Sequence, residues 1–339
     1  MKFKTKDITA LKESVIKAGK ITLITHLNPD GDAVGSCVAL YHYFKILMKD
    51  ILIIIPNTPP ANLLFILKGT DYIIAEKDFK SAKKRFAQTD LILITDMNAN
   101  GRAGENIEKI LNESEADKIL IDHHISPEKY PVVFSYPEAS STCEVVWHVL
   151  HKLSGKKVFT QEISSALYLG IITDTGSFSY SCNNPELYIV ISNLLKSGIK
   201  ANKINQSVFD TYSNDKLQLL GYAINQKMRV FPDKRAAFIY ISAAELKKFN
   251  YKPGDLEGVV NYCLKLECVD FCALLSERDN KIRMSFRSKD ESIDVNKFAS
   301  KYWNGGGHVM ASGGKSYDTL DNVVKKLTEQ INKRLFLGL

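Results

Sequence analysis

The sequence predicts an α/β fold: a parallel β-sheet with helices on both faces, joined to a smaller α+β domain. In the first half of the chain, continuously apolar runs alternate with amphipathic segments, which is typical of parallel strands covered by helices on both sides. In the second half, paired strands are mixed with helices, which is typical of an α+β domain. The length of 339 residues is also sufficient for about two domains.

Four apolar runs predict the strands of the first sheet. They are "ITLIT", "ILIII", "LILIT" and "KILI", at residues 21–25, 51–55, 91–95 and 118–121. The first three precede the helix-like segments "DAVGSCVALYHYFKILM", "ANLLFIL" and "NIEKILNES". Three more helices are predicted at "STCEVVWHVLHKLS", "QEISSALYLGIIT" and "NPELYIVISNLLKSG". Ser140, Ser141 or Thr142 can cap the first of these three, and Gly198 ends the last.

The remaining segments predict a helical linker and a second domain. We expect a catalytic domain at 1–200, a helical linker at 201–226 and a substrate domain at 227–339. Strands are predicted at "KMRVF", "AAFIYIS", "DFCALLSE" and "KIRMSFRS", the last two forming a hairpin around "RDNK". Helices are predicted at "LEGVVNYCLKLE", "DVNKFASKYW" and "TLDNVVKKLTEQINKRL".

Composition narrows the class of protein. With 45% hydrophobic and 24% charged residues, the chain resembles an ordinary globular protein, and no apolar run approaches the length of a membrane span. The net charge of +7 suits an anionic substrate, but solubility alone also explains it. There is no signal peptide and no C-x-x-C pair, so we expect free thiols in the cytoplasm. Cys263, Cys268 and Cys272 are interpreted as buried small hydrophobes rather than as a zinc cluster.

Acidic and histidine residues follow the predicted strands. The first strand leads into "HLNPDGD", the third ends at Asp96, the fourth ends at "DHH", and "TDTGSFSY" adds a further carboxylate. The residues are His26, Asp30, Asp32, Asp96, Asp122, His123, His124 and Asp174. Because the carboxyl ends of parallel strands share one edge of a sheet, we expect these side chains to meet in space.

Each residue alone has a structural explanation, but the group does not. Asp30 suits a turn, Asp32 can cap a helix, and a single histidine is usually structural. Together, the carboxylates would repel one another, and only Arg102 lies nearby to balance them. Divalent cations remove this conflict. Mixed carboxylate and imidazole ligands favour Mn²⁺, leave Fe²⁺, Co²⁺ or Zn²⁺ open, and make Mg²⁺ less natural.

The number of ligands predicts two ions rather than one. At least six of these eight residues are candidate metal ligands, which is more than one catalytic ion with an open position needs. Two ions about 3.5–4 Å apart would share one carboxylate and a bridging water or hydroxide, an arrangement suited to in-line displacement at phosphorus.

The motifs resemble those of a known family. In order along the chain, "HLNPDGDAVGS", Asp96, "DHH" and "GIITDTGSFSY" resemble the four motifs of the DHH phosphoesterases. "GGGH" resembles the associated C-terminal DHHA1 domain. The ending "RMSFRS…DVNKFASKYWNGGGH" is similar to the branch that contains short-oligonucleotide nucleases (nanoRNases) and adenosine-bisphosphate (pAp) phosphatases.

The resemblance implies a role for each residue. One ion would be held by His26, Asp30 and Asp96. The other would be held by Asp32, Asp96, His123 and Asp174, with Asp96 bridging. His124 would face the substrate, contacting a phosphoryl oxygen or assisting proton transfer, and Asp122 would orient an imidazole. Arg287 and His308 would grip a phosphate.

The second domain also predicts a phosphate site from its residues. Gly305, Gly306 and Gly307 expose backbone N–H groups, and His308 and Arg287 add charged donors. The alternative is that these glycines are flexible turns. Arg102 faces the phosphate or, equally, is a solvent-exposed loop arginine.

We therefore expect a phosphoesterase that hydrolyses short oligoribonucleotides, linear dinucleotides and 3′-phosphoadenosine 5′-phosphate, using a metal-bridging hydroxide. The second domain would hold the remote nucleotide across a cleft. Alternatives are a manganese-dependent inorganic pyrophosphatase, a single-strand exonuclease, and a non-catalytic nucleotide-binding module. No membrane partner is expected, and a homodimer is compatible with the family.

Overall fold

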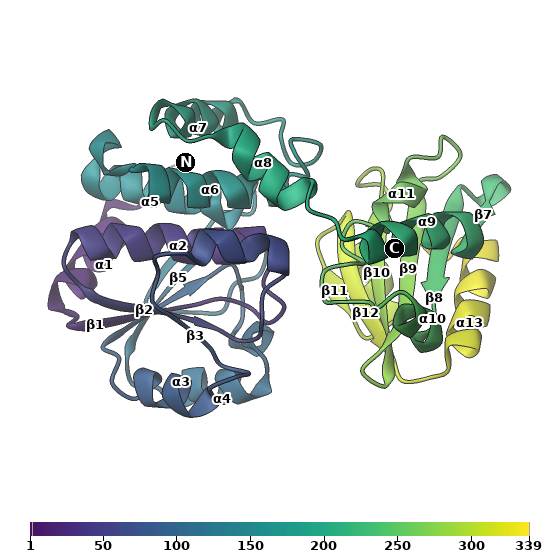
Figure 1. Cartoon of the computed structure of the whole chain (residues 1–339), viewed down its shortest axis with the longest axis horizontal. Helices are drawn as coiled ribbons and strands as arrows, with labels where there is room; N and C mark the ends of the chain where they lie inside the picture. Colours follow the sequence, from purple (N-terminus) through teal and green to yellow (C-terminus); the bar gives the residue numbers. More distant parts are fainter. Residues whose placement is uncertain (2, 339) are drawn as a thin grey trace. The chain divides into compact units, whose positions relative to one another are not determined.

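The computed structural model describes residues 1 and 3–338 and divides into two compact units, Met1–Thr211 and Tyr212–Leu339 (Figure 1). The predicted linker holds two helices, α8 (Ala201–Phe209) and α9 (Asn214–Lys227), and the units divide between them. α8 packs on the first unit, and α9 packs on the second.

The first unit contains a six-stranded sheet in the order β3-β2-β1-β4-β5-β6, with every pair of neighbours parallel. The predicted strands are β1 (Lys20–Ile24), β2 (Asp50–Ile55), β4 (Leu91–Thr95) and β5 (Asp117–Asp122). Two strands were not predicted: β3 (Tyr72–Ile74) and β6 (Val132–Ser135). Both are short edge strands, and such segments carry too few residues for an alternating pattern to stand out. The chain builds outward from β1 to β3 and then returns to β4, so the strand order reverses between β1 and β4.

Helices cover both faces of this sheet, as predicted (Figure 1). One face carries α1 (Thr5–Lys17), α2 (Gly31–Ile46), α5 (Thr142–Ser154) and α6 (Gln161–Asp174). The other face carries α3 (Phe79–Phe86) and α4 (Glu105–Glu113). α7 (Pro185–Lys196) and α8 pack against α6. The segment "ANLLFIL" forms a 3₁₀ helix, η1 (Ala61–Leu67), rather than an α-helix.

Two glycines allow α2 and α6 to approach closely. A Cβ atom at Gly35 would lie 2.5 Å from the carbonyl oxygen of Ala166, and one at Gly170 would lie 2.2 Å from Cys143 Sγ. The same added atom at Gly170 would lie 2.8 Å from a carboxylate oxygen of Asp32. Any side chain at these positions would therefore push the helices apart at the place where they carry acidic residues.

The second unit contains a mixed six-stranded sheet in the order β11-β12-β10-β9-β8-β7. Its strands are β7 (Met228–Phe231), β8 (Ala236–Ile241), β9 (Phe271–Arg278), β10 (Lys281–Ser288), β11 (Gly306–Gly307) and β12 (Ala311–Ser316). The β8–β9 pair is parallel, and the other neighbours are antiparallel. The predicted β9–β10 hairpin turns at Asp279 and Asn280, whose φ angles of 53° and 56° match a type I′ turn.

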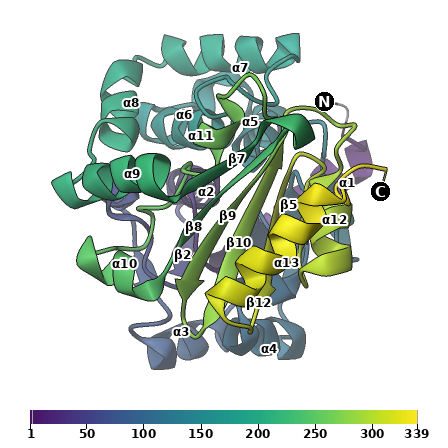
Figure 2. The same ribbon diagram turned by 90° about the vertical axis from the view of Figure 1, so that its right-hand side faces the viewer.

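Each face of the second sheet has its own helical layer. α12 (Val295–Tyr302) and α13 (Leu320–Asn332) pack on one face, and α13 lies across the strands in Figure 2. α9, α10 (Ala243–Lys248) and α11 (Asn261–Leu264) pack on the other. The prediction of a full helix at "LEGVVNYCLKLE" was wrong, since only the four residues of α11 form an α-helix. Gly258 interrupts the segment with a left-handed φ of 74°.

Candidate metal centre

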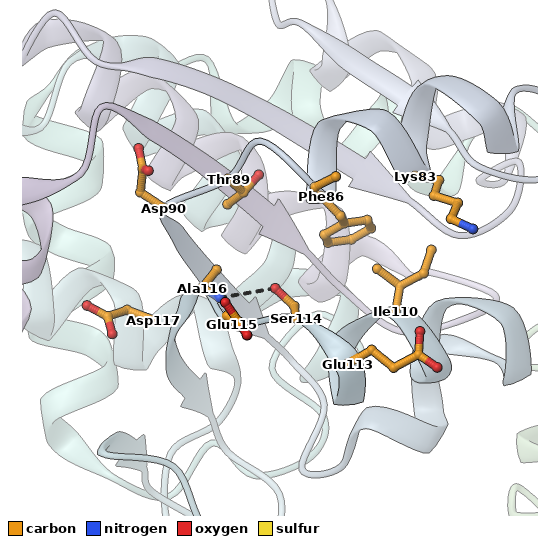
Figure 3. A pocket seen from close by; sticks show the side chains of 11 residues that line it. Lys83, Phe86, Thr89, Asp90, Ile110, Glu113, Ser114, Glu115, Ala116 and Asp117 are labelled. Carbon is orange, nitrogen blue, oxygen red and sulfur yellow. Dashed lines mark hydrogen bonds between the residues drawn. The ribbon is translucent and has the colours of Figure 1, made fainter.

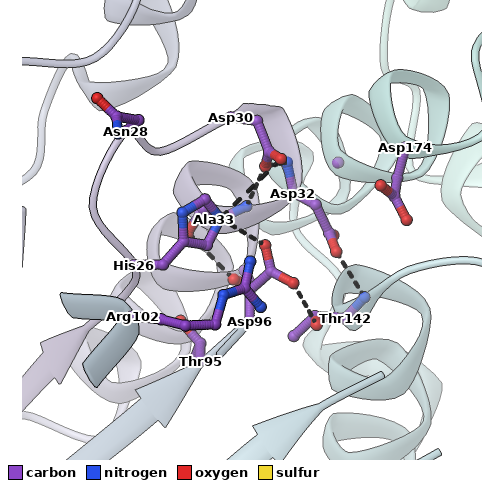
Figure 4. A network of polar contacts seen from close by, with 12 residues as sticks. His26, Asn28, Asp30, Asp32, Ala33, Thr95, Asp96, Arg102, Thr142 and Asp174 are labelled. Carbon is purple, nitrogen blue, oxygen red and sulfur yellow. Dashed lines mark hydrogen bonds and ion pairs between the residues drawn. The ribbon is translucent and has the colours of Figure 1, made fainter. Parts of the chain in front are cut away.

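The acidic and histidine residues that follow the strands meet at the carboxyl edge of the first sheet. His26 follows β1, Asp96 follows β4, and His123 and His124 follow β5. These three strands are adjacent, and β1 and β4 flank the point where the strand order reverses. Open α/β sheets bind their ligands at this point. Figure 4 shows the part of this cluster around His26 and Asp96, to which α2 and α6 add the carboxylates of Asp32 and Asp174.

Asp96 lies at the centre of the cluster. Its Oδ2 is 3.4 Å from Nε2 of His26, and its Oδ1 is 3.7 Å from Nε2 of His123. The two carboxylate oxygens therefore face two different imidazoles. Asp96 is also one of the few non-glycine residues with a left-handed backbone, with φ at 57°. That conformation is unfavourable for an aspartate by roughly 1 kcal/mol, and such strain gathers at functional sites.

The other predicted ligands surround Asp96. Asp30 Oδ2 lies 4.0 Å from His26 Nε2, while Asp30 Oδ1 caps α2 by accepting from the backbone N–H groups of Asp32 and Ala33. His123 Nε2 lies 3.9 Å from Asp32 Oδ2 and 3.5 Å from Asp174 Oδ2, at the end of α6. All six predicted ligands are thus brought together, from four separate parts of the chain.

The charges in this cluster oppose one another. Burial raises the pKa of the Asp32 carboxyl well above its usual value, and the charges of Asp96 and Asp174 add to this effect. Burial and neighbouring carboxylates likewise raise the pKa of Asp174. Burial also acts to raise the pKa of Asp96, but the histidines beside it, His26 foremost, outweigh burial and lower it. Burial acts to lower the pKa of His26, and contact with Asp96 overcomes this and raises it.

The donor set fits divalent cations. His26, Asp30 and Asp96 form one group of ligand atoms within 4.8 Å of one another, and Asp32, Asp96 and His123 form a second. The contacts of 3.4–4.0 Å between imidazole nitrogens and carboxylate oxygens are longer than hydrogen bonds. Nδ1 of His26 lies 3.0 Å from the carbonyl oxygen of Leu27, so it carries the proton and leaves Nε2 free to bind a cation. Positive ions among these atoms would remove the repulsion between buried carboxylates.

His124 lies beside Asp96, with its Nδ1 3.7 Å from Asp96 Oδ1, and it belongs to a further chain of polar contacts. Its Nδ1 lies 2.7 Å from Oδ1 of the fully buried Asp122, and its Nε2 lies 2.8 Å from Nη1 of Arg102. A guanidinium only donates hydrogen bonds, so Nε2 accepts and the proton is on Nδ1. Asp122 therefore orients an imidazole, that of His124, and Arg102 points into the site rather than into solvent (Figure 4).

Sequence reasoning missed two residues at the start of α5. The Thr142 hydroxyl donates to Asp96 Oδ1 at 2.9 Å, and its backbone N–H donates to Asp32 Oδ2 at 2.6 Å. The backbone N–H of Cys143 donates to Asp32 Oδ1 at 2.8 Å. Thr142 was considered only as a helix cap, a role that Ser141 fills by accepting from Glu144 N–H. The hydroxyl-rich run "SST" was the available signal, but it does not reveal its partners.

In the second unit, two of the three glycines of the predicted phosphate site form a strand rather than a flexible turn. Gly306 and Gly307 are β11 and pair with Gly313 and Ser312 of β12. A Cβ at Gly305 would lie 1.9 Å from the carbonyl oxygen of Gly313, so close backbone approach requires glycine there. Arg287 on β10 pairs with Ala311, whose backbone also bonds that of His308. Arg287 and His308 therefore lie at the same end of the β10–β12 pair.

A groove in the first unit lies away from this chemistry. It has a volume of about 650 Å³ and is lined by residues that include Asp90 and Asp117 (Figure 3). Asp90 and Asp117 lie at the amino ends of β4 and β5, whereas Asp96 and His123 follow their carboxyl ends. The groove is therefore at the opposite edge of the sheet and contains no histidine.

Two further features concern the cysteines and the lengths of the helices. Cys263 and Cys272 are buried and Cys268 is partly buried, all three as free thiols. Among the described residues, no group of potential metal ligands includes a cysteine. Of the helices that the structure describes, none is both long and apolar enough to cross a membrane.

Comparisons with known proteins cover both units. Residues 20–171 match the family model described as "DHH family, N-terminal domain", and residues 235–335 match "DHHA1 domain". A protein of Streptococcus mutans named probable bifunctional oligoribonuclease and PAP phosphatase NrnA is 27% identical over 305 residues, covering 89% of this chain and 91% of its own. The Bacillus subtilis bifunctional oligoribonuclease and PAP phosphatase NrnA is 26% identical over 325 residues, covering 94% and 97%.

Solved structures share the architecture. An exopolyphosphatase-related protein from Bacteroides fragilis superposes with a TM-score of 0.92 at 35% identity, covering 98% of both chains. RecJ from Thermus thermophilus, solved in complex with Mn²⁺, has a TM-score of 0.54 at 12% identity and covers 98% of this chain and 54% of its own. The second likeness extends to the fold alone.

Proposed function

The chain belongs to the DHH family of divalent-metal-dependent phosphoesterases, and on this premise we propose that its substrates are short oligoribonucleotides, linear dinucleotides and 3′-phosphoadenosine 5′-phosphate. Mononucleotides would be the products of the first two substrates, and AMP and phosphate those of the third. The family matches confirm the resemblance found in the motifs. The relatives named oligoribonuclease and PAP phosphatase, aligned over most of the chain, support this substrate class.

The position of Asp96 is the observation that carries the proposal. One of its oxygens faces His26 and the other faces His123, each beside further carboxylates. We assign His26, Asp30 and Asp96 to one divalent cation and Asp32, Asp96, His123 and Asp174 to a second, with Mn²⁺ as the preferred ion. When bound, such cations lower the pKa of water and neutralise charge on phosphoryl oxygens.

The protein's own groups have distinct tasks around that centre. The backbone N–H groups of Thr142 and Cys143 hold both oxygens of Asp32, and the Thr142 hydroxyl fixes Asp96. Arg102 supplies guanidinium donors for a phosphoryl oxygen. We assign His124 to contact with a phosphoryl oxygen or to proton transfer at Nε2. Either role requires Arg102 to leave Nε2 when substrate binds, and Asp122 at Nδ1 would then stabilise the charged imidazole.

The second unit is assigned to the non-reacting part of the substrate. Arg287 and His308 lie at one end of the β10–β12 pair, where they can bind a terminal phosphate. Because such contacts are remote from the reacting phosphorus, Arg287→Ala is expected to raise KM more than it lowers kcat.

A product time course tests the proposal. The purified chain is incubated with Mn²⁺ and, separately, a dinucleotide, a thirty-nucleotide RNA, 3′-phosphoadenosine 5′-phosphate, pyrophosphate and polyphosphate. We expect rapid turnover of the dinucleotide and release of phosphate from the bisphosphate. Turnover of pyrophosphate or polyphosphate without cleavage of the dinucleotide would instead identify a phosphoanhydride hydrolase. Equal rates on the thirty-mer and the dinucleotide would identify a single-strand exonuclease.

A further inference from the structure

One face of the second sheet is only half covered by helices. The apolar layer formed with α9, α10 and α11 uses residues of β8 and β9, such as Ile239, Cys272 and Leu274. Among the described residues, this layer includes none from β10 or β12. A groove opens over the hairpin end of β10 and β12 on that side, while the opposite surface is buried under α12 and α13.

The open surface carries cations at three of four successive outward positions of β10. Along β10, burial alternates strictly, with Ile282, Met284 and Phe286 in the core. The residues between them, which face the open side, are Lys281, Arg283, Ser285 and Arg287. Strand pairing places Lys315 beside Arg283 and Gly313 beside Ser285. Residues two apart on a strand are separated by about 6.6–6.8 Å, so this row has a fixed pitch.

A groove of about 380 Å³ covers the part of this row from Lys281 to Ser285, next to Arg287. Four cationic side chains line it, Arg278, Lys281, Arg283 and Lys315, and no carboxylate does. Arg283 pairs with Asp279 in the hairpin turn, but the Nε atoms of Arg278 and Arg283 are buried and have no hydrogen-bond partner in the described structure. Gly313 and Gly314 form part of the floor and leave backbone accessible. This groove has the charge and unused donors of a polyanion site.

We propose that this groove, the β10 track (Lys281, Arg283, Ser285, Gly313 and Lys315), binds successive phosphates of a single-stranded oligonucleotide. The proposal rests on the function proposed above and extends it from the terminal nucleotide at Arg287 to the nucleotides beyond. Arg283 lies four residues from Arg287, about 13 Å along the strand. A row of cations with a regular pitch tracks a phosphate backbone without reading bases.

The β10 track predicts a specific dependence on substrate length. A dinucleotide bound at Arg287 cannot reach Arg283 and Lys315, whereas a chain of about five nucleotides can, given the strand pitch. Affinity should therefore rise between two and about five nucleotides and then level off, because the row ends at the β9–β10 hairpin.

Gly313→Glu is the sharpest test. A Cβ at Gly313 meets only the carbonyl oxygen of Met284 at an ordinary 3.6 Å, so the side chain fits and places a carboxylate in the β10 track. The matched control is Gly221→Glu on α9, an exposed glycine whose Cβ would meet nothing within 4 Å. Binding of labelled dinucleotide and pentanucleotide is measured by fluorescence anisotropy in EDTA, which prevents hydrolysis.

We expect Gly313→Glu to weaken pentanucleotide binding by more than about tenfold and to change dinucleotide binding less than about twofold, while Gly221→Glu changes neither. The double variant Lys281→Gln/Lys315→Gln should also reduce the slope of log K against log salt by about 1.4 for the pentanucleotide, since each phosphate contact contributes about 0.7. An unchanged pentanucleotide affinity, or equal losses for both lengths, would overturn the β10 track. Failure of the wild-type chain to cleave a dinucleotide in Mn²⁺ would instead overturn the proposed function, and the anisotropy result would still decide the β10 track.

Discussion

The two units of this protein surround their carboxylates in opposite ways. In the first unit, Asp32 and Asp174 lie among other carboxylates, and their pKa values are raised by burial and repulsion. In the second unit, Glu245 accepts hydrogen bonds from Tyr222 at 2.6 Å and from Lys227 at 2.8 Å, and it closes a capping box with Ser242. Although burial acts to raise it, the pKa of Glu245 falls from 4.5 to about 2 because these donors favour the charged form.

We infer from this difference that the cluster around Asp96 serves catalysis and that the network around Glu245 serves stability. The network around Glu245 is electrostatically complete without any ligand. The cluster around Asp96 becomes balanced only when positive ions enter. Ligand binding should therefore affect the two units unequally, and each prediction below tests that asymmetry. The chain's two tryptophans make this measurable, because Trp147 is buried in the first unit and Trp303 in the second.

The largest effect is expected from Asp96→Asn. This change removes the carboxylate that faces both imidazoles, so dinucleotide turnover should fall by more than the roughly 10–100-fold typical of losing a partner outside the ligand set. The fold should be retained, as judged by circular dichroism. Activity within tenfold of the wild type would contradict the bridging role, and Asp90→Asn, at the opposite sheet edge, serves as a control.

Metal binding should stabilise the first unit alone. At a Mn²⁺ concentration of 100 times Kd, the expected gain is about 2.7 kcal/mol. Thermal unfolding followed by Trp147 fluorescence in a Trp303→Phe variant should shift upward, and that followed by Trp303 in a Trp147→Phe variant should not. Equal shifts of both signals would show that the asymmetry between the units is wrong.

Acid should weaken the second unit through Glu245. Since the folded pKa lies below the unfolded value, the stabilisation is complete above about pH 4.5 and is lost as pH falls toward 2. Glu245→Gln should therefore lower the stability of this unit at pH 7 by about 1–2 kcal/mol, allowing for partial exposure. It should also flatten the pH dependence between 4.5 and 2. Urea unfolding monitored at Trp303 measures both effects, and an unaltered pH dependence would count against the assignment.

Asp174→Asn should cause the smallest change in the stability of the metal-free protein. The side chain is 30% exposed, and neutralising it relieves repulsion in the metal-free cluster. We expect the metal-free first unit to gain up to about 1 kcal/mol, or about 2–4 °C. The same variant should lose most of its stabilisation by Mn²⁺. A variant that is destabilised without metal would show that Asp174 is instead a structural residue.

Much of the first unit could be predicted because its signals are local. Apolar runs such as "LILIT" are strands buried on both faces, and the residue after each run must lie at the shared sheet edge. The positions of His26, Asp96 and His123 followed from that rule. The edge strands β3 and β6 and the 3₁₀ segment η1 were missed or misassigned because packing, not local pattern, decides short segments.

Long-range hydrogen bonds were beyond local reasoning. Thr142 lies 46 residues from Asp96 and 110 residues from Asp32, and a run of hydroxyl residues does not predict which distant side chains it will bind. The glycines of "GGGH" were ambiguous for a similar reason. Their role in close pairing with β12 depends on "SGG" several residues later, so neither the predicted phosphate site nor the alternative of flexible turns indicated the strand pair that Gly306 and Gly307 form.

The close approach of α2 and α6 at their glycines is a requirement for any scaffold that is to carry this site. Asp32 and Asp174 come from these two helices, so the spacing of the helices sets the gap between two of the acidic groups. Gly170→Ala adds one methyl group, which would lie 2.2 Å from Cys143 Sγ on α5 and 2.8 Å from Asp32 Oδ1, so it should push these groups away and misalign the acidic residues. Transplanting the acidic and histidine residues onto another scaffold would therefore fail unless the narrow helix crossing were transplanted with them.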